Sequence, residues 1–187
     1  MNQNYASLTF SNSVKKVQEK FGSRKHYSRV EESGDRFVLT NSEIEYIKSR
    51  DSFYISSVGE NDWPYIQHRG GKKGFLKVIN ETTLGIADFS GNKQYISTGN
   101  FLTNNKSMIF IMDYPTQSRL KIWVETEVVE VNKNQKLYEQ LVDKNYGAKI
   151  ERLLLFHIKA YDWNCNQHIT QRFTNEEFEM LIINESL

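Results

Sequence analysis

Three segments between Trp63 and Trp123 decide how this chain folds: WPYIQHRGGKKGFLKV (63–78), TTLGIADFSGNKQYISTGN (82–100) and MDYPTQSRLKIW (112–123). The first segment joins a strand to a basic, glycine-rich loop. The second is a strand that breaks at a polar turn, and the third leads into a strand that begins at an arginine. We expect these strands to bring their polar ends to one site.

Alternating residues indicate strands throughout this region. Residues 53–58 and 63–69 are separated by the turn Gly59–Asp62, which predicts a hairpin. In its second strand, Tyr65, Gln67 and Arg69 fall on one face. Residues 119–131 alternate without interruption, which predicts one long strand.

The whole chain fits a mainly β class with helices at its margins (α+β). Six or seven strands are separated by turns every 8–12 residues, and no strand–helix–strand alternation runs through the sequence. This pattern favours an antiparallel barrel with peripheral helices. Helices are predicted over 14–21, over 41–50, from Asn92 onward, over 134–145 and from 174 to about 183. Those at 41–50 and 174–183 have capping-box spacing.

The length of 187 residues predicts one domain with extensions. We expect a basic N-terminal arm over 1–40, a barrel domain over 41–172 and a C-terminal helix over 173–187 that packs on the same domain. The arm is either solvated or packed across a partner subunit.

The charge balance excludes several classes of partner. With 24 basic and 23 acidic residues the net charge is +1, so we expect neither a nucleic-acid-binding nor a membrane-binding surface. No apolar run approaches the ~18 residues of a membrane span, and no secretory signal is visible, so we expect a cytoplasmic protein.

Cys165 is the single cysteine of the chain. A lone cysteine is more often buried, and a redox role for its thiol would require exposure and a depressed pKa.

A cluster of cations is the main chemical signal. Five of them fall within 25 residues, and no carboxylate lies between Asp62 and Glu81. Guanidinium and ammonium groups are the side chains that hold phosphate esters. The cluster comprises Arg69, Lys72, Lys73, Lys77 and Lys93, of which we expect Lys72 and Lys73 to lie in solvent.

Two further features bear on the ligand. The segment Gly91–Lys93, at the predicted start of a helix, would add backbone N–H groups and the positive end of the helix dipole to the cations. Asp88 ends a strand beside them and either caps the turn or meets a polar ring edge. The sequence contains no zinc-binding motif, no P-loop and no nucleophile elbow, so we predict no metal site and no nucleophilic hydrolysis.

In the order and spacing of its motifs, the chain resembles the pyridoxamine 5′-phosphate oxidase-like, FMN-binding split-barrel proteins. The resemblance covers about residues 40–172. Within that family the chain is similar to an oxidase-related branch marked by the motifs QHRGG, GNKQYIS and NCxQHI. It is carried by residues 50–78, 82–100, 112–123 and DWNCNQHITQR (162–172).

This resemblance implies an antiparallel split barrel that forms a homodimer, with two FMN sites at the subunit interface. Arg69 and Lys77 match the phosphate-binding strand pair, Lys93 matches a retained lysine, and Trp163 and Arg172 resemble residues that reach the partner's flavin. The implied FMN-binding residues are Arg69, Lys77, Asp88, Asn92, Lys93, Gln94, Arg119 and Trp163, and the implied substrate-binding residues are His168 and Arg172.

The departures from the family concern the substrate. Asn92 stands where the oxidases carry arginine, Leu120 where they carry glutamine, and residues 166–172 replace their Arg-Leu-x-x-Arg segment. We therefore expect an FMN-dependent oxidoreductase that acts on an unidentified small substrate, and not the vitamin B6 oxidase. The alternatives are a flavin-binding or redox-sensing module without turnover, and a split barrel that binds deazaflavin or haem.

Overall fold

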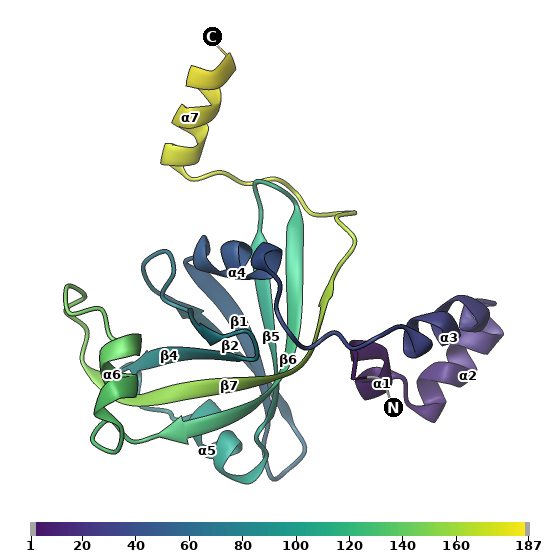
Figure 1. Cartoon of the computed structure of the whole chain (residues 1–187), viewed down its shortest axis with the longest axis horizontal. Coiled ribbons are helices and arrows are strands. Elements are labelled where there is room, and N and C mark those ends of the chain that lie inside the picture. The colour runs from purple at the N-terminus through teal and green to yellow at the C-terminus, as the bar shows by residue number, and fades with distance from the viewer. Residues whose placement is uncertain (1–2, 186–187) are drawn as a thin grey trace.

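Seven antiparallel strands make one sheet that curls without closing, in the computed structural model, which describes residues 3–185 (Figure 1). Residues 1–2 of the predicted N-terminal arm and residues 186–187 of the predicted C-terminal segment lie outside the described residues. The strand order is β2-β1-β5-β6-β7-β4-β3. The strands are β1 (Ser52–Val58), β2 (Pro64–Gly70), β3 (Lys77–Asn80), β4 (Thr83–Phe89), β5 (Lys106–Asp113), β6 (Ser118–Val129) and β7 (Ile150–Trp163).

The two long central strands allow the sheet to curl. β6 pairs with β5 over Ser118–Glu125 and with β7 over Leu120–Val129, and its register against β7 shifts between Trp123 and Val124. Such a bulge bends a strand and increases its twist. The edge strand β2 therefore approaches β4 without pairing with it, and this opening is the split of the barrel.

The core lies inside the curl and follows the alternation that the sequence shows. Leu120, Ile122 and Val124 of β6 are at most 2% exposed, and they pack with Phe53 and Phe156. Burying this apolar surface is the main stabilising contribution to the fold. The predicted strands, including the 53–58/63–69 hairpin, are confirmed.

Seven helices accompany the sheet in the described part of the chain. The predicted capping box of α4 is present, with the Thr40 N–H donating to Glu43 at 3.0 Å. The helices are α1 (Tyr5–Thr9), α2 (Asn12–Lys20), α3 (Arg24–Glu32), α4 (Asn41–Lys48), α5 (Ile96–Thr103), α6 (Gln135–Leu141) and α7 (Asn175–Glu185).

The helix expected from Asn92 begins four residues later, at Ile96. Lys93 and Tyr95 both have left-handed backbones, with φ of 63° and 53°, and such residues do not propagate a right-handed helix. The prediction that Gly91–Lys93 lies at a helix N-terminus is therefore wrong, and this segment is a loop.

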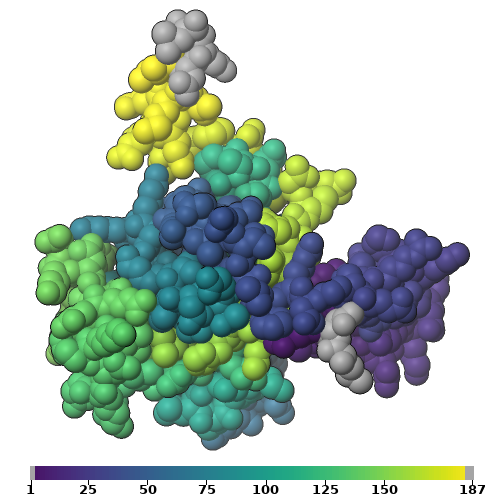
Figure 2. Space-filling model, in the orientation of Figure 1, coloured from purple at the N-terminus to yellow at the C-terminus, as the bar shows by residue number. Residues whose placement is uncertain are grey.

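The N-terminal residues form a small helical lobe beside the sheet, not a simple extended arm (Figures 1 and 2). The side chain of Asn4, 1% exposed, donates to the carbonyls of Val30, Glu31 and Ser33 and so joins α1 to α3. The ring of Tyr5 stacks on Trp123 of β6 at 5.8 Å between centroids. The lobe thus contacts the sheet of its own chain.

The C-terminal helix α7 extends away from the sheet, where we expected it to pack on the barrel (Figures 1 and 2). Its capping box is present, since the Thr174 N–H donates to Glu177 at 2.9 Å. However, the consecutive residues 180–183 are apolar and each is at least 42% exposed. Consecutive positions point to different sides of a helix, so no single apolar stripe directs α7 onto the barrel.

None of the helices described within residues 3–185 is both long and apolar enough to cross a membrane. In the same residues, no group of three or more histidine, cysteine or acidic side chains is arranged to hold a metal ion.

Candidate functional site

A polar pocket of about 190 Å³ opens at the split of the sheet, where β2 faces β4 and β7. Its floor is made by strand residues, and its rim is made by the loop after β4 and the first turn of α5. The lining residues are Tyr65, Gln67, Arg69, Asp88, Phe89, Gly91, Asn92, Lys93, Gln94, Tyr95, Ile96, Ser97, Thr98, Glu151 and Arg152.

Asp88 lies at the bottom of the pocket and is 2% exposed. It comes from β4, and its carboxylate bridges the guanidinium groups of Arg69 from β2 and Arg152 from β7. The Arg152 Nη1–Asp88 Oδ2 distance is 2.9 Å. Because β2 and β4 do not pair, the contact between Arg69 and Asp88 joins the two sides of the split through side chains alone.

Two further polar side chains orient Arg69. Its Nη2 donates to the hydroxyl of Ser97 at 3.2 Å, and that hydroxyl donates to Gln67 Oε1 at 2.7 Å. The Nε of Arg69 is buried and has no hydrogen-bond partner among the described residues. Buried donors are nearly always paired in proteins, so this guanidinium retains an unused donor beside the pocket.

The rim is a tight loop whose shape places Lys93 and Tyr95 at the mouth of the pocket. The side chain of Asn92 accepts a hydrogen bond from the Gln94 N–H at 3.1 Å, as in an Asx turn. The Tyr95 hydroxyl donates to Glu151 at 3.2 Å. The Arg152 guanidinium lies 4.9 Å from the centroid of the Tyr95 ring, a cation–π contact.

The electrostatic balance of the pocket is positive. Arg69, Lys93 and Arg152 oppose the carboxylates of Asp88 and Glu151, which leaves one net positive charge. A hydrogen bond from the Ser90 hydroxyl, with further contributions from Tyr95 and Arg152, lowers the pKa of Glu151 and keeps it ionised. The chemistry of these donors suits a phosphate monoester, which offers several acceptor oxygens to guanidinium, ammonium and hydroxyl groups.

Five of the predicted site residues therefore meet in one pocket: Arg69, Asp88, Asn92, Lys93 and Gln94. Lys77 does not join them. It lines a smaller neighbouring hollow of about 40 Å³ together with Lys72 and Lys73, and Phe89 lines both cavities. Lys72, expected in solvent, is 54% exposed and forms an ion pair with Asp143.

Arg119 and Trp163 lie on the strand pair β6/β7, outside the pocket. The Arg119 Nη2 donates to the Cys165 carbonyl at 2.9 Å, and its Nε is buried without a partner among the described residues. The indole N–H of Trp163 donates to Glu43 of α4 at 2.7 Å. Cys165 itself is exposed, so the expectation of a buried thiol is wrong.

The two residues predicted to hold a substrate lie on the segment that leads to α7. His168 is exposed and has a left-handed backbone with φ of 63°. Arg172 lies 5.1 Å from the ring centroid of Tyr114 and lines a third hollow of about 200 Å³. In a single copy of the chain, neither residue lines the pocket at the split.

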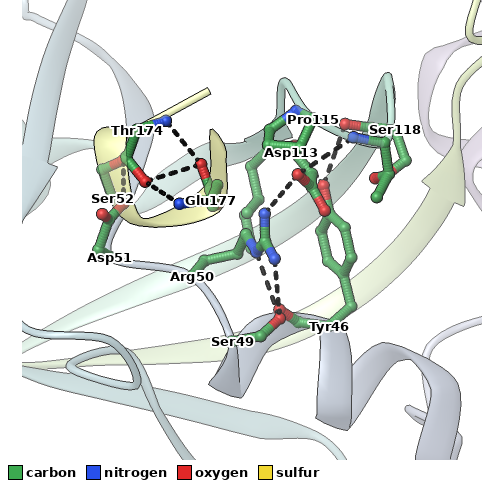
Figure 3. Close-up of polar contacts among 12 residues, drawn as sticks. Tyr46, Ser49, Arg50, Asp51, Ser52, Asp113, Pro115, Ser118, Thr174 and Glu177 are labelled. Carbon is green, nitrogen blue, oxygen red and sulfur yellow. Dashed lines mark hydrogen bonds and ion pairs between the residues drawn. The ribbon is translucent and has the colours of Figure 1, made fainter. Parts of the chain in front are cut away.

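The third hollow adjoins a buried polar cluster that fixes α4 to the β5–β6 turn (Figure 3). Arg50 pairs with Asp113 at 2.7 Å, and the guanidinium lies over the ring of Tyr46. The Tyr46 hydroxyl donates to the Ser118 carbonyl at 3.1 Å. Burial raises the pKa of Tyr46 to about 12.

Arg152 is the main site residue that the sequence does not reveal. It reaches the pocket because it lies opposite Asp88 in the β4–β7 register, a pairing that spans 64 residues. Thr98 was not predicted either. The Thr98 hydroxyl accepts a hydrogen bond from Arg152 at 3.0 Å, and it lies in the pocket because α5 begins at Ile96 and not at Asn92. The one signal in the sequence for this role of Arg152 is its position near the start of a predicted strand.

Comparison with known proteins gives structural neighbours only. No family model and no curated protein matches the sequence. The structure resembles HupZ of Group A Streptococcus with a TM-score of 0.54 and 11% identity, covering 72% of this chain and 100% of HupZ. It also resembles a Lactobacillus delbrueckii protein described as a candidate pyridoxamine 5′-phosphate oxidase, with a TM-score of 0.52 and 15% identity, covering 67% of this chain and 93% of that one.

These similarities establish the fold. They do not identify a ligand, which we infer from the side chains that line the pocket. The expected antiparallel split barrel with peripheral helices is confirmed. The chain shares the split-barrel fold of these structural neighbours, one of which is described as a candidate pyridoxamine 5′-phosphate oxidase.

Proposed function

We propose that this protein binds FMN, with the flavin's phosphate in the pocket at the split, and that it works as an FMN-dependent oxidoreductase. The observation that carries the proposal is the convergence of Arg69 and Lys93 with the Ser97 hydroxyl in one net-positive pocket. Bound there, FMN would supply the redox chemistry through its ring. The chain's own residues would anchor, orient and desolvate the ligand.

The size of the pocket favours a ligand that enters it only in part. Pockets that enclose a whole drug-sized ligand span roughly 300–1,000 Å³, and this pocket measures about 190 Å³. A phosphate with part of a ribityl chain fits that volume, and the flavin ring would lie outside. We propose that a second copy of the chain covers the ring, in a homodimer.

The exposed apolar side chains of the β1–β2 hairpin support a dimer. Tyr54, Trp63 and Ile66 of this hairpin are 40%, 74% and 68% exposed, and its strand β2 forms one edge of the sheet. Apolar side chains gathered on one surface are typical of protein–protein interfaces. Arg119, Trp163, His168 and Arg172 do not line the pocket of their own chain, and we propose that they act at the ring or substrate end.

Identification of the co-purifying ligand tests the proposal. The protein is purified, its visible spectrum is recorded, and the extracted ligand is identified by mass spectrometry, followed by reduction with NADH or NADPH and reoxidation by oxygen or a quinone. A flavin spectrum, an FMN mass and turnover are expected. A flavin that is never turned over would support binding without catalysis. A haem spectrum, or a colourless protein that takes up no added FMN, would contradict the proposal.

A further inference from the structure

Asp88 serves two arginines with one buried carboxylate. Its Oδ1 accepts from Arg69 and its Oδ2 accepts from Arg152, while the side chains of the two arginines are 14% and 16% exposed. Glu151 supplies a second carboxylate through its 2.6 Å ion pair with Arg152, so the two guanidinium groups are balanced and Lys93 gives the pocket its net positive charge. A ligand anion would be drawn by this net charge and by the hydrogen-bond donors that the two arginines leave unused.

Arg152 has unused hydrogen-bonding capacity toward that anion. A guanidinium carries five N–H donors. The two on Nη1 are engaged by Asp88 at 2.9 Å and by Thr98 at 3.0 Å, and one on Nη2 is engaged by Glu151 at 2.6 Å. The other Nη2 donor and the Nε donor have no hydrogen-bond acceptor among the described residues, and Arg152 lines the pocket.

Neighbouring groups hold Arg152 in one orientation. Glu151 and Thr98 lie on either side of its guanidinium, and the Tyr95 ring lies 4.9 Å from it. Arg69 is oriented in the same way by Ser97. Two guanidinium groups from different strands are thus fixed around one carboxylate before any ligand arrives, and such preorganisation reduces the entropic penalty of binding.

We propose that Arg152 is a phosphate-binding residue that forms a two-arginine clamp with Arg69, aligned by Asp88, and that this clamp makes the site selective for phosphorylated flavin over riboflavin. The inference rests on the proposed function and extends it to the class of ligand that the site accepts. The simpler account gives Arg152 only a structural role, as a counter-ion that keeps Asp88 paired.

The two accounts differ in what Arg152→Gln does to each ligand. The variant and the full-length wild type are titrated with FMN and with riboflavin by flavin fluorescence. The clamp predicts that the variant loses about 10- to 100-fold in affinity for FMN, the range for a charge-assisted hydrogen bond, and changes its riboflavin affinity by less than about twofold. Arg152→Lys, which keeps the charge and loses the fork, should lie between the wild type and the glutamine variant for FMN.

Arg36→Gln is the matched control, because the Arg36 side chain is 56% exposed, pairs with Asp162 at 3.9 Å and does not line the pocket. It should bind both flavins as the wild type does. If Arg152→Gln does not fold, Arg152→Lys carries the test, because it keeps the positive charge beside Asp88 and should still lose affinity for FMN but not for riboflavin.

Unchanged FMN affinity in Arg152→Gln, or an equal loss for both flavins, would overturn the clamp while leaving FMN binding by the wild type intact. Failure of the wild type to bind FMN would overturn the proposed function instead, so the two failures are separable.

Discussion

Asp88 on β4 and Arg152 on β7 are direct cross-strand partners, and their side chains form a 2.9 Å ion pair at the floor of the pocket. Arg69 reaches the same carboxylate from β2, on the other side of the split. One buried acid therefore both joins the edge strand β2 to β4 and β7 across the split and aligns the cations of the candidate site. Stability and ligand binding should be coupled at this residue.

Replacing Asp88 with Asn should destabilise the protein strongly. The change leaves two largely buried guanidinium groups without their shared counter-ion, and breaking such a pair costs about 3 kcal/mol. Chemical denaturation measures this loss. Glu130→Gln, which breaks an exposed pair with Lys133, should change the free energy of unfolding by less than about 1 kcal/mol. Equal losses of unfolding free energy in the two variants would show that the Asp88 ion pairs stabilise the fold no more than an exposed pair does.

The cations of the chain should differ in their importance for FMN. Arg69→Ala removes a guanidinium inside the pocket and should weaken FMN binding by ~1.5–3 kcal/mol. Lys93→Ala removes an exposed rim charge and should have a smaller effect, about 1 kcal/mol. Lys72→Ala is the control, since Lys72 lines a different hollow and pairs with Asp143. Similar losses at all three positions would indicate a diffuse basic surface instead of a site.

Tyr46 should make the stability fall at high pH. Its pKa rises from 10.0 to about 12 because burial disfavours the phenolate, so the folded state retains a proton that the unfolded state has lost. The contribution is fully present below pH 10 and is lost as the pH rises through about 12. Denaturation of the wild type and Tyr46→Phe across this range tests it. The difference in stability between the two proteins should shrink with pH, and a constant difference would contradict the assignment.

Two glycines should respond in opposite directions to alanine. At Gly85 a Cβ would lie 2.9 Å from side-chain atoms of both Ile79 and Leu141, so Gly85→Ala should destabilise the protein by about 1–3 kcal/mol. Gly99 lies inside α5 with open space around its Cα, and Gly99→Ala should stabilise by roughly 0.5–1 kcal/mol through helix propensity. Thermal unfolding compares the two. A stabilising Gly85→Ala would show that the β4–α6 packing is looser than described.

Local signals in the sequence predict most of the sheet. The alternation of Tyr65, Gln67 and Arg69 places all three in the pocket, because a strand puts every second residue on one face. The capping boxes at Thr40 and Thr174 mark their helices because both hydrogen bonds lie within four residues.

Non-local and conformational features escape such signals. Arg152 enters the site through a strand pairing that no short-range pattern specifies. The start of α5 was misplaced because the left-handed backbones of Lys93 and Tyr95 have no strong signature in residues other than glycine. The helix predicted over 14–21 is present as α2, whereas α1 and α3 were missed because Asn4, at one end of the lobe, is held by carbonyls near residue 31.

Equilibrium titration of the ligand-free protein with FMN, and with riboflavin in parallel, tests whether the pocket holds the phosphate of a flavin. We expect saturable binding of one FMN per chain, with riboflavin bound at least about tenfold more weakly because it lacks the phosphate that Arg69 and Arg152 would hold. Equal affinity for the two flavins, or no binding of FMN, would contradict it.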